Sequence, residues 1–200
     1  MSTPQSAPAA PDRRTLIADT AIDLVAGVGL RGLTHRAVDG AAALPPGSTS
    51  YYFRTRTALI GACYRRLAEL DLEDLGEAPA PASDRDAVAA AIGALLHRWL
   101  TAGRARQLAR FELSLEAARS PELGAALHQA GLGSRARAAA VLSALGAERP
   151  QESAELMVAW TDGLLYDRLA GALARSRPSP DPAELTATVR RMLDAALAGG

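Results

Sequence analysis

Hydrophobic residues recur every three or four positions along most of this chain, with polar residues between them. The clearest runs are Leu16, Ile17, Ala21, Leu24 and Val25, then Val88, Ile92, Leu95, Leu96 and Trp99, and finally Leu185, Val189, Met192, Leu193 and Ala196. This spacing places the apolar side chains on one face of an α-helix. No stretch shows a convincing strand pattern, so the chain is predicted to be all-α, with about nine helices.

The region 12–56 divides into three short predicted helices. The first begins at Asp12, a residue type that caps helix N-termini. The second begins at Thr34 and stops before Pro45, because proline lacks a backbone donor and disfavours helical conformation in the residue before it. The third ends near Phe53. The second and third helices, joined by a tight turn, form a helix-turn-helix pattern.

Residues 57–200 contain the remaining predicted helices. The strongest start signal is Ser120-Pro121-Glu122, which combines a cap, a proline at the first helical position and a carboxylate near the positive end of the helix dipole. Capping-box patterns also begin at Ser83 and Asp181. Long amphipathic runs come last, at 151–174 and 183–197. Residues 1–11 are rich in Pro, Ser, Thr and Ala, which predicts a disordered tail.

Composition narrows the class of protein. The chain has 200 residues, of which 48% are apolar, so it is long enough to bury a core and too apolar to be disordered. A single cysteine, Cys63, excludes an internal disulfide framework and a cysteine-based zinc site. No segment reaches the roughly 18 apolar residues of a membrane span, and a signal-peptide pattern is missing. We therefore expect a cytoplasmic protein without a membrane partner.

Charge is unevenly distributed although the net charge is zero. Residues 31–66 contain six arginines and one acidic residue, Asp39, whereas the chain after residue 66 contains 14 arginines and 18 acidic residues. A basic segment on an otherwise acidic protein is typical of a nucleic-acid contact surface. A solvated charged face would produce the same pattern, so charge alone does not decide between the two.

The segment 33–60 reads LTHRAVDGAAALPPGSTSYYFRTRTALI. It resembles, without a gap, the DNA-binding signature of TetR-family transcriptional regulators. That signature consists of a Leu-Thr helix start, a second helix of small residues, a turn, a recognition helix ending in aromatic residues, a basic residue and a Leu pair. Here these parts are Leu33-Thr34, 37–42, 44–47, 48–53, Arg56 and Leu59-Ile60. The resemblance implies a DNA-binding domain at 12–56 and a helical ligand-binding and dimerisation domain at 57–200.

Residue chemistry independently favours DNA contact by the second helix of the motif. A recognition helix presents small and polar side chains to base edges in the major groove, and tyrosines offer apolar surface to thymine methyl groups and hydroxyls to phosphates. Arg36 and Arg56 are expected to hold phosphates beside it. The residues expected at the DNA are His35, Arg36, Pro46, Gly47, Ser48, Thr49, Ser50, Tyr51, Tyr52 and Arg56.

Alternative roles remain open for several of these residues. His35 could equally be an exposed polar residue in the first turn of its helix. One ring of the Tyr51-Tyr52 pair could belong to the core of the DNA-binding domain, where Phe53 is expected. Two positions also depart from the family pattern. Ala43 occupies a turn position that is usually glycine, which predicts a strained backbone or a different turn. Pro46 replaces a residue that is often basic, so base recognition is expected to depend more on the hydroxyl groups.

The resemblance also implies a pocket for a small effector and a homodimer formed by the last two long helices, near 151–174 and 183–197. Such a dimer would place two recognition helices roughly 34–36 Å apart on a palindromic operator in double-stranded DNA. Bulky residues in the body are candidates for the pocket wall, although each could be ordinary core: Trp99, Phe111, Leu115, Trp160 and Tyr166. Glu112 and Glu116, one turn apart, are expected on a salt-bridged surface.

Other classes of protein fit the sequence less well. An enzyme is not expected, since no nucleophile elbow, phosphate loop or paired inward carboxylates can be found. No cofactor is expected, and the isolated His97 and His128 predict no metal site. The favoured hypothesis is a repressor that a ligand releases from its operator, repression being the family's commoner behaviour. The alternative is a helical small-molecule-binding or interaction module that has lost operator binding.

Overall fold

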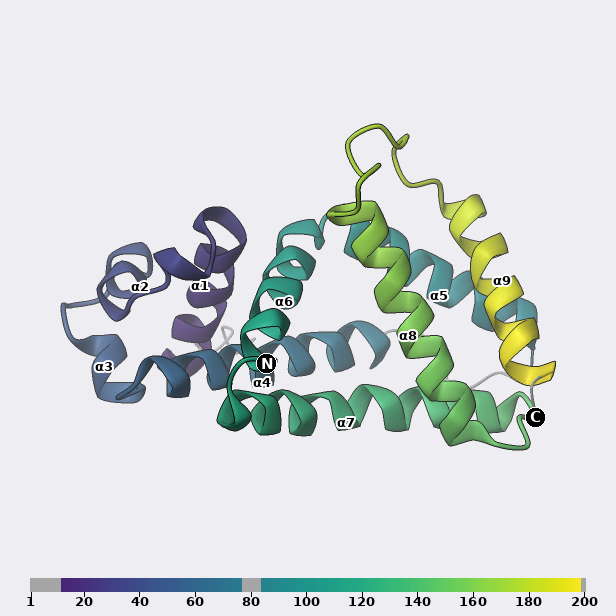
Figure 1. Ribbon diagram of the computed structural model, residues 1–200, viewed down its shortest axis with the longest axis horizontal. Coiled ribbons are helices and arrows are strands. Elements are labelled where there is room, and N and C mark those ends of the chain that lie inside the picture. The colour runs from purple at the N-terminus through teal and green to yellow at the C-terminus, as the bar shows by residue number, and fades with distance from the viewer. Residues whose placement is uncertain (1–11, 77–83, 199–200) are drawn as a thin grey trace, which may run out of the picture.

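A computed structural model describes residues 12–76 and 84–198 of the chain. Within these residues it contains nine α-helices, one short 3-10 helix and no strand (Figure 1), which confirms the all-α prediction. The elements are α1 (Arg13–Val28), η1 (Leu30–Gly32), α2 (His35–Ala41), α3 (Ser48–Tyr52), α4 (Arg56–Gly76), α5 (Arg85–Leu100), α6 (Arg104–Ala117), α7 (Pro121–Ala144), α8 (Pro150–Leu169) and α9 (Pro182–Ala198). The predicted tail at 1–11 and the predicted cap Ser83 lie outside the described residues.

The helices form an elongated molecule with a small head at one end (Figure 1). The head contains α1, α2 and α3. Helix α4 runs from the head into the body and packs along α7, while α5, α8 and α9 pack together at the far end. Helix α6 stands between the two ends and contacts α1 on one side and α5 and α8 on the other. A movement of α6 would therefore change its contacts with both the head and the body.

Two clusters of buried apolar residues hold these helices. One joins α1, α2 and the first half of α4 to α6 and the beginning of α7, with Ile17, Val38, Leu59 and Leu113 among its members. The other joins α5, the end of α7, α8 and α9. Helix α6 packs against both clusters, since its Leu113 belongs to the first and its Phe111 lies against the second.

Helix starts follow the predicted caps closely. The Thr34 hydroxyl accepts a hydrogen bond from the Ala37 N–H at 3.1 Å, and the Ser120 hydroxyl accepts one from the Leu123 N–H at 3.4 Å. The Asp181 carboxylate accepts a bond from the Glu184 N–H at 3.1 Å at the start of α9. These bonds satisfy donors that have no partner inside the helix, which is why such residues mark helix starts.

One predicted boundary differs from the structure. The helix predicted at 151–174 ends at Leu169 instead. There the N–H groups of Ala170 and Gly171 both donate to the Tyr166 carbonyl. A Cβ at position 171 would lie 2.6 Å from the Asp167 carbonyl oxygen, so this tight exit requires glycine.

Candidate functional site

Asp39 in α2 fixes the orientation of α3. Its Oδ2 accepts a hydrogen bond from the Gly47 N–H at 2.8 Å, and its Oδ1 accepts bonds from the Thr49 N–H at 2.8 Å and the Thr49 hydroxyl at 2.6 Å. Asp39 and Thr49 are both buried. Helix α3 has only five residues, which is too few for a helix to be stable without tertiary support. The carboxylate therefore holds the second half of the helix-turn-helix against the first.

The same hydrogen bonds keep Asp39 ionised. Burial alone would raise the pKa of Asp39, but the bonds from the Thr49 hydroxyl and from the Thr49 and Gly47 amides, with His35 nearby, lower it below its ordinary value. Sequence analysis counted Asp39 only as an acidic charge and missed this structural role. The available signal was an acidic residue on a short helix made largely of small residues.

The connection between α2 and α3 passes through two residues in left-handed conformation. Ala43 has a φ angle of 51° and Gly47 has a φ angle of 89°. A left-handed backbone is unfavourable for alanine, so the strain expected from an alanine at this turn is confirmed. At Gly47 a Cβ would meet nothing within 4 Å. The need for glycine at position 47 is therefore conformational and not steric.

Most of the residues predicted to contact DNA lie at the surface of the head. Arg36, Pro46, Gly47, Ser50 and Tyr51 are exposed, and Ser48, Tyr52 and His35 are half-buried. Tyr51 is 79% exposed, which is unusual for a large aromatic side chain. The prediction that Thr49 faces the DNA is wrong for this conformation, because its side chain is fully buried and its hydroxyl donates to Asp39.

The two tyrosines of α3, Tyr51 and Tyr52, differ in burial and in contacts. Tyr51 projects into solvent, whereas the half-buried Tyr52 ring lies 5.1 Å from it, edge to face, and under the Arg14 guanidinium at 5.6 Å. Phe53 is buried in the head, as its sequence position predicted. Tyr52 thus joins α3 to α1, and Arg14 is a residue of this surface that sequence analysis did not identify.

Two residues expected at phosphates or bases are engaged within the protein. The His35 Nε2 donates to the Phe53 carbonyl at 2.7 Å, which ties the start of α2 to the end of α3. The Arg56 guanidinium donates to the Leu30 carbonyl at 2.8 Å and lies 3.7 Å from the Glu116 carboxylate. Both side chains therefore have an intramolecular role, whatever contact they make with DNA.

Glutamates of α6 hold the head. The Glu112 Oε1 accepts a hydrogen bond from the Leu30 N–H at 3.1 Å, and Glu116 pairs with Arg56. Glu116 also lies 3.6 Å from Arg119, three residues further along the chain. The expected salt-bridged surface is thus only part of their role, because these carboxylates also join α6 to Leu30 in the head and to Arg56 at the start of α4. Local sequence patterns could not predict the first of these contacts, since Leu30 and Glu112 lie 82 positions apart.

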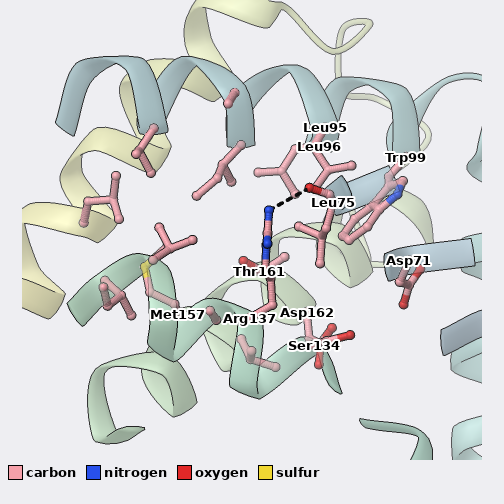
Figure 2. Close-up of a pocket in the computed structure, with 18 of the residues that line it drawn as sticks. Asp71, Leu75, Leu95, Leu96, Trp99, Ser134, Arg137, Met157, Thr161 and Asp162 are labelled. Carbon is pink, nitrogen blue, oxygen red and sulfur yellow. Dashed lines mark hydrogen bonds between the residues drawn. The ribbon is translucent and has the colours of Figure 1, made fainter. Parts of the chain in front are cut away.

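A cavity of about 170 Å³ lies in the body, lined by residues of all six helices from α4 to α9 (Figure 2). Its walls are mainly apolar, with Val88, Ile92, Leu96, Met157 and Leu193 among them. Of the five residues predicted to line a pocket, Trp99 does so. Phe111, Leu115, Trp160 and Tyr166 are not among the lining residues, and Leu115 is 59% exposed.

Charged side chains gather at one side of this cavity. Asp71 of α4 forms a buried ion pair with Arg110 of α6. Three residues further along α4, Asp74 pairs with Arg106 and accepts a bond from the Trp99 indole N–H at 2.7 Å. Arg110 also lies 5.6 Å from the centre of the Trp99 ring. The cavity therefore touches, through Arg110, the same helix that holds the head through Glu112.

An exposed apolar strip follows the outer side of α8. Leu156, Trp160 and Tyr166 are 46%, 36% and 50% exposed, and Phe111 packs edge to face on the Tyr166 ring at 5.5 Å. The opposite side of α8, with Met157 and Leu165, belongs to the body core. Helix α8 is thus apolar on two sides, which explains why periodicity alone could not assign Trp160 and Tyr166.

In residues 12–76 and 84–198, no helix is long and apolar enough to cross a membrane. No group of three or more His, Cys, Asp or Glu side chains in this part of the chain is arranged to hold a metal ion.

Solved structures with the same fold include transcriptional regulators. A regulator from Rhodococcus sp. Rha1 is 23% identical, with a TM-score of 0.78 over 94% of this chain and 97% of its own. The multidrug binding protein EbrR, in complex with ethidium, is 30% identical, with a TM-score of 0.70 over 90% of this chain and 98% of its own. A TetR family member from Streptomyces coelicolor A3 is 28% identical, with a TM-score of 0.69 over 91% and 98%.

No curated protein sequence matches this chain, but the profile of a protein family does. The profile described as "Tetracyclin repressor-like, C-terminal domain" matches residues 83–198, more than half of the chain and the whole of the body from α5 to α9. With a helix-turn-helix head in front of that body, the chain belongs to the TetR family of transcriptional regulators.

Proposed function

We propose that this protein binds a palindromic operator as a homodimer and that a small molecule in the body cavity changes its affinity for the DNA. The observation that supports this most directly is the position of α6. Its Arg110 lines the cavity and pairs with Asp71, and its Glu112, about half a turn further on, bonds to the head at Leu30. One rigid helix thus contacts both the effector cavity and the DNA-binding domain.

The coupling follows from this arrangement. A ligand changes operator affinity only if it binds the two conformations of the body with different affinities. A ligand beside the Asp71–Arg110 pair would alter the contacts of α6, and Glu112 and Glu116 would pass the displacement to the head. Helix α3 is fixed to the rest of the head through Asp39, so it would move with the head as a unit.

The DNA-contacting surface is proposed to comprise Arg36, Pro46, Gly47, Ser50 and Tyr51, with Ser48 and Tyr52 at its edge. These residues are exposed or half-buried at and around α3. The hydroxyls and the tyrosine would read base edges and phosphates in the major groove. An operator-binding protein works in the compartment that contains the DNA, which supports a cytoplasmic location.

The homodimer is proposed to form through α8 and α9. The strip of Leu156, Trp160 and Tyr166 on α8 is apolar and exposed in the single chain, as expected of a surface that a second copy covers. An isologous dimer through this strip would turn two heads to one side of the assembly. Two recognition helices would then meet successive major grooves roughly 34 Å apart.

Operator release is the experiment that tests this function. The full chain is incubated with genomic fragments, the retained fragment is sequenced, and its affinity is measured with and without candidate small molecules. EbrR is described as a multidrug binding protein and was crystallised with ethidium, proflavin and malachite green, which supports a small organic effector here. Specific retention of DNA that no compound alters would contradict the effector role alone. Absence of specific retention would favour a helical binding module without an operator.

A further inference from the structure

We infer that the body cavity binds a small organic cation of about one aromatic ring, whose protonated nitrogen is held by Asp162. This inference rests on the proposed effector role of the cavity and adds the chemical class of the effector.

Four charged side chains line the cavity, and three of them have partners. Asp71 and Arg110 pair with each other. Arg137 donates to the Leu75 carbonyl at 3.4 Å, in the last turn of α4, where the helix dipole is negative (Figure 2). Asp162 of α8 has no hydrogen bond and no ion pair with any residue that the structure describes. Asp162 is therefore the one charged side chain of these four that has neither a hydrogen-bond nor an ion-pair partner among the described residues, whereas Arg137 is bonded to a neutral carbonyl.

The two arginines that act electrostatically on Asp162 already have carboxylate partners. Arg110 of α6 and Arg135 of α7 both act electrostatically on Asp162, but Arg110 pairs with Asp71, and Arg135 lies 4.0 Å from Glu155. Burial raises the pKa of Asp162, and these two arginines oppose that rise only in part. A cationic ligand would supply the counter-charge that no residue in the described part of the chain provides.

A second acceptor in the same wall lacks a donor. The Asp71 side chain is only 7% exposed, and its Oδ1 has no hydrogen-bond partner among the described residues. An unsatisfied buried acceptor is unfavourable, and a ligand N–H group would satisfy it. The Nε of Arg110 also lacks an acceptor, but the charge of that guanidinium is balanced by Asp71.

The remaining wall fixes the size and character of the ligand. A cavity of about 170 Å³ is close to the ~150 Å³ of an engineered apolar cavity that holds benzene. Trp99 lies on one side, Met157 lies on the other, and Asp162 and Ser134 lie together between them (Figure 2). A single ring against Trp99 and the aliphatic wall, with an amine reaching Asp162, fits this distribution.

Three compounds of nearly equal size and different charge test the inference: 2-phenylethylamine, 2-phenylethanol and 3-phenylpropionate. Binding to the full chain is measured by calorimetry at neutral pH. The amine should bind about tenfold or more tighter than the alcohol, because its hydrogen bond to a carboxylate is charge-assisted, and the carboxylate compound should bind least. The affinity of the amine should fall as the pH is lowered through the raised pKa of Asp162, because the protonated carboxyl no longer attracts a cation.

Asp162→Asn should remove the preference for the amine over the alcohol without lowering stability, since Asp162 has no hydrogen bond to lose. Asp167→Asn is the matched control, because Asp167 lies on the same helix, is half-buried and pairs with Arg177 outside the cavity lining; it should bind the amine as the parent does. The inference is wrong if the alcohol or the acid binds as tightly as the amine, if none of the three binds at millimolar concentration, or if Asp162→Asn retains the preference. Operator release, measured separately, tests the proposed function: amine binding that leaves the operator complex intact contradicts that function and not the inference.

Discussion

Replacing Asp39 by Asn should loosen the recognition helix while leaving the rest of the protein folded. The substitution keeps the size of the side chain but replaces one acceptor oxygen with an NH₂ group. If the remaining oxygen stays beside Thr49, which donates twice, the new NH₂ group faces the Gly47 N–H. Two donors then meet, and one charge-assisted bond becomes an unfavourable contact.

The expected magnitude follows from these bonds. A hydrogen bond to a charged group contributes about 1.5–3 kcal/mol, and an unsatisfied buried donor costs about 1–3 kcal/mol. Gly47 is exposed and its N–H can turn to water, so the lower part of this range applies. We expect Asp39→Asn to reduce the free energy of unfolding by about 2 kcal/mol. Urea unfolding followed by circular dichroism measures this difference.

Operator affinity separates this explanation from simple electrostatics. Removing a negative charge beside the DNA would by itself tighten binding. Loss of the Asp39 network predicts weaker binding instead, because α3 is no longer held in one orientation. The control is Asp23→Asn in α1, which makes the same charge change at an exposed position with no hydrogen bond in the described structure. Asp39→Asn that binds operator more tightly and unfolds like the parent would refute the reasoning.

The pH dependence supplies an internal check. The pKa of Asp39 is lowered in the folded protein, so its contribution to stability is present above the unfolded-state pKa of about 3.9 and is lost as the pH falls through the folded-state pKa. The difference in unfolding free energy between the parent and Asp39→Asn should therefore be constant near neutral pH. It should shrink only below about pH 4.

Three further predictions test the turn, the link to the body and the dimer. Gly47→Ala should destabilise the protein by about 1–2 kcal/mol, because the backbone at position 47 is left-handed. Gly40→Ala, inside α2 and equally free of contacts, should instead stabilise the protein by about 0.5–1 kcal/mol. Thermal unfolding measures both changes, and equal effects of the two substitutions would contradict this explanation. Glu112→Ala should reduce the change in operator affinity that an effector causes, as measured by fluorescence anisotropy, while effector binding itself persists. Trp160→Arg should shift the sedimentation coefficient from that of a dimer toward that of a monomer. Leu132→Arg is the control, because Leu132 on α7 is also exposed, and this variant should remain a dimer. If both variants sediment as dimers, the α8 interface is wrong.

The sequence predicted those parts of the fold that depend on local chemistry. Helix starts at Thr34, Ser120 and Asp181 were predictable because a capping side chain bonds within three residues of itself. The helix-turn-helix was predictable because its turn requires residues of unusual backbone conformation at short spacing. The strain at Ala43 followed from the same argument.

Contacts between distant residues could not be predicted in this way. Glu112 meets Leu30 across 82 positions of the chain, and nothing in the local pattern of α6 identifies that partner. The pocket prediction failed for Trp160 and Tyr166 for a related reason. Bulk identifies residues that avoid water, but only the packing of α8 on its neighbours shows that these two side chains lie on the outer face.

The central claim is that the exposed surface around α3 binds operator DNA as part of a dimer. The most direct measurement is footprinting of the best genomic fragment retained by the full chain, at two salt concentrations. The account predicts a protected palindrome with two half-sites about one DNA turn apart, and binding that weakens steeply as salt rises. Retention of no fragment above the nonspecific background would contradict it.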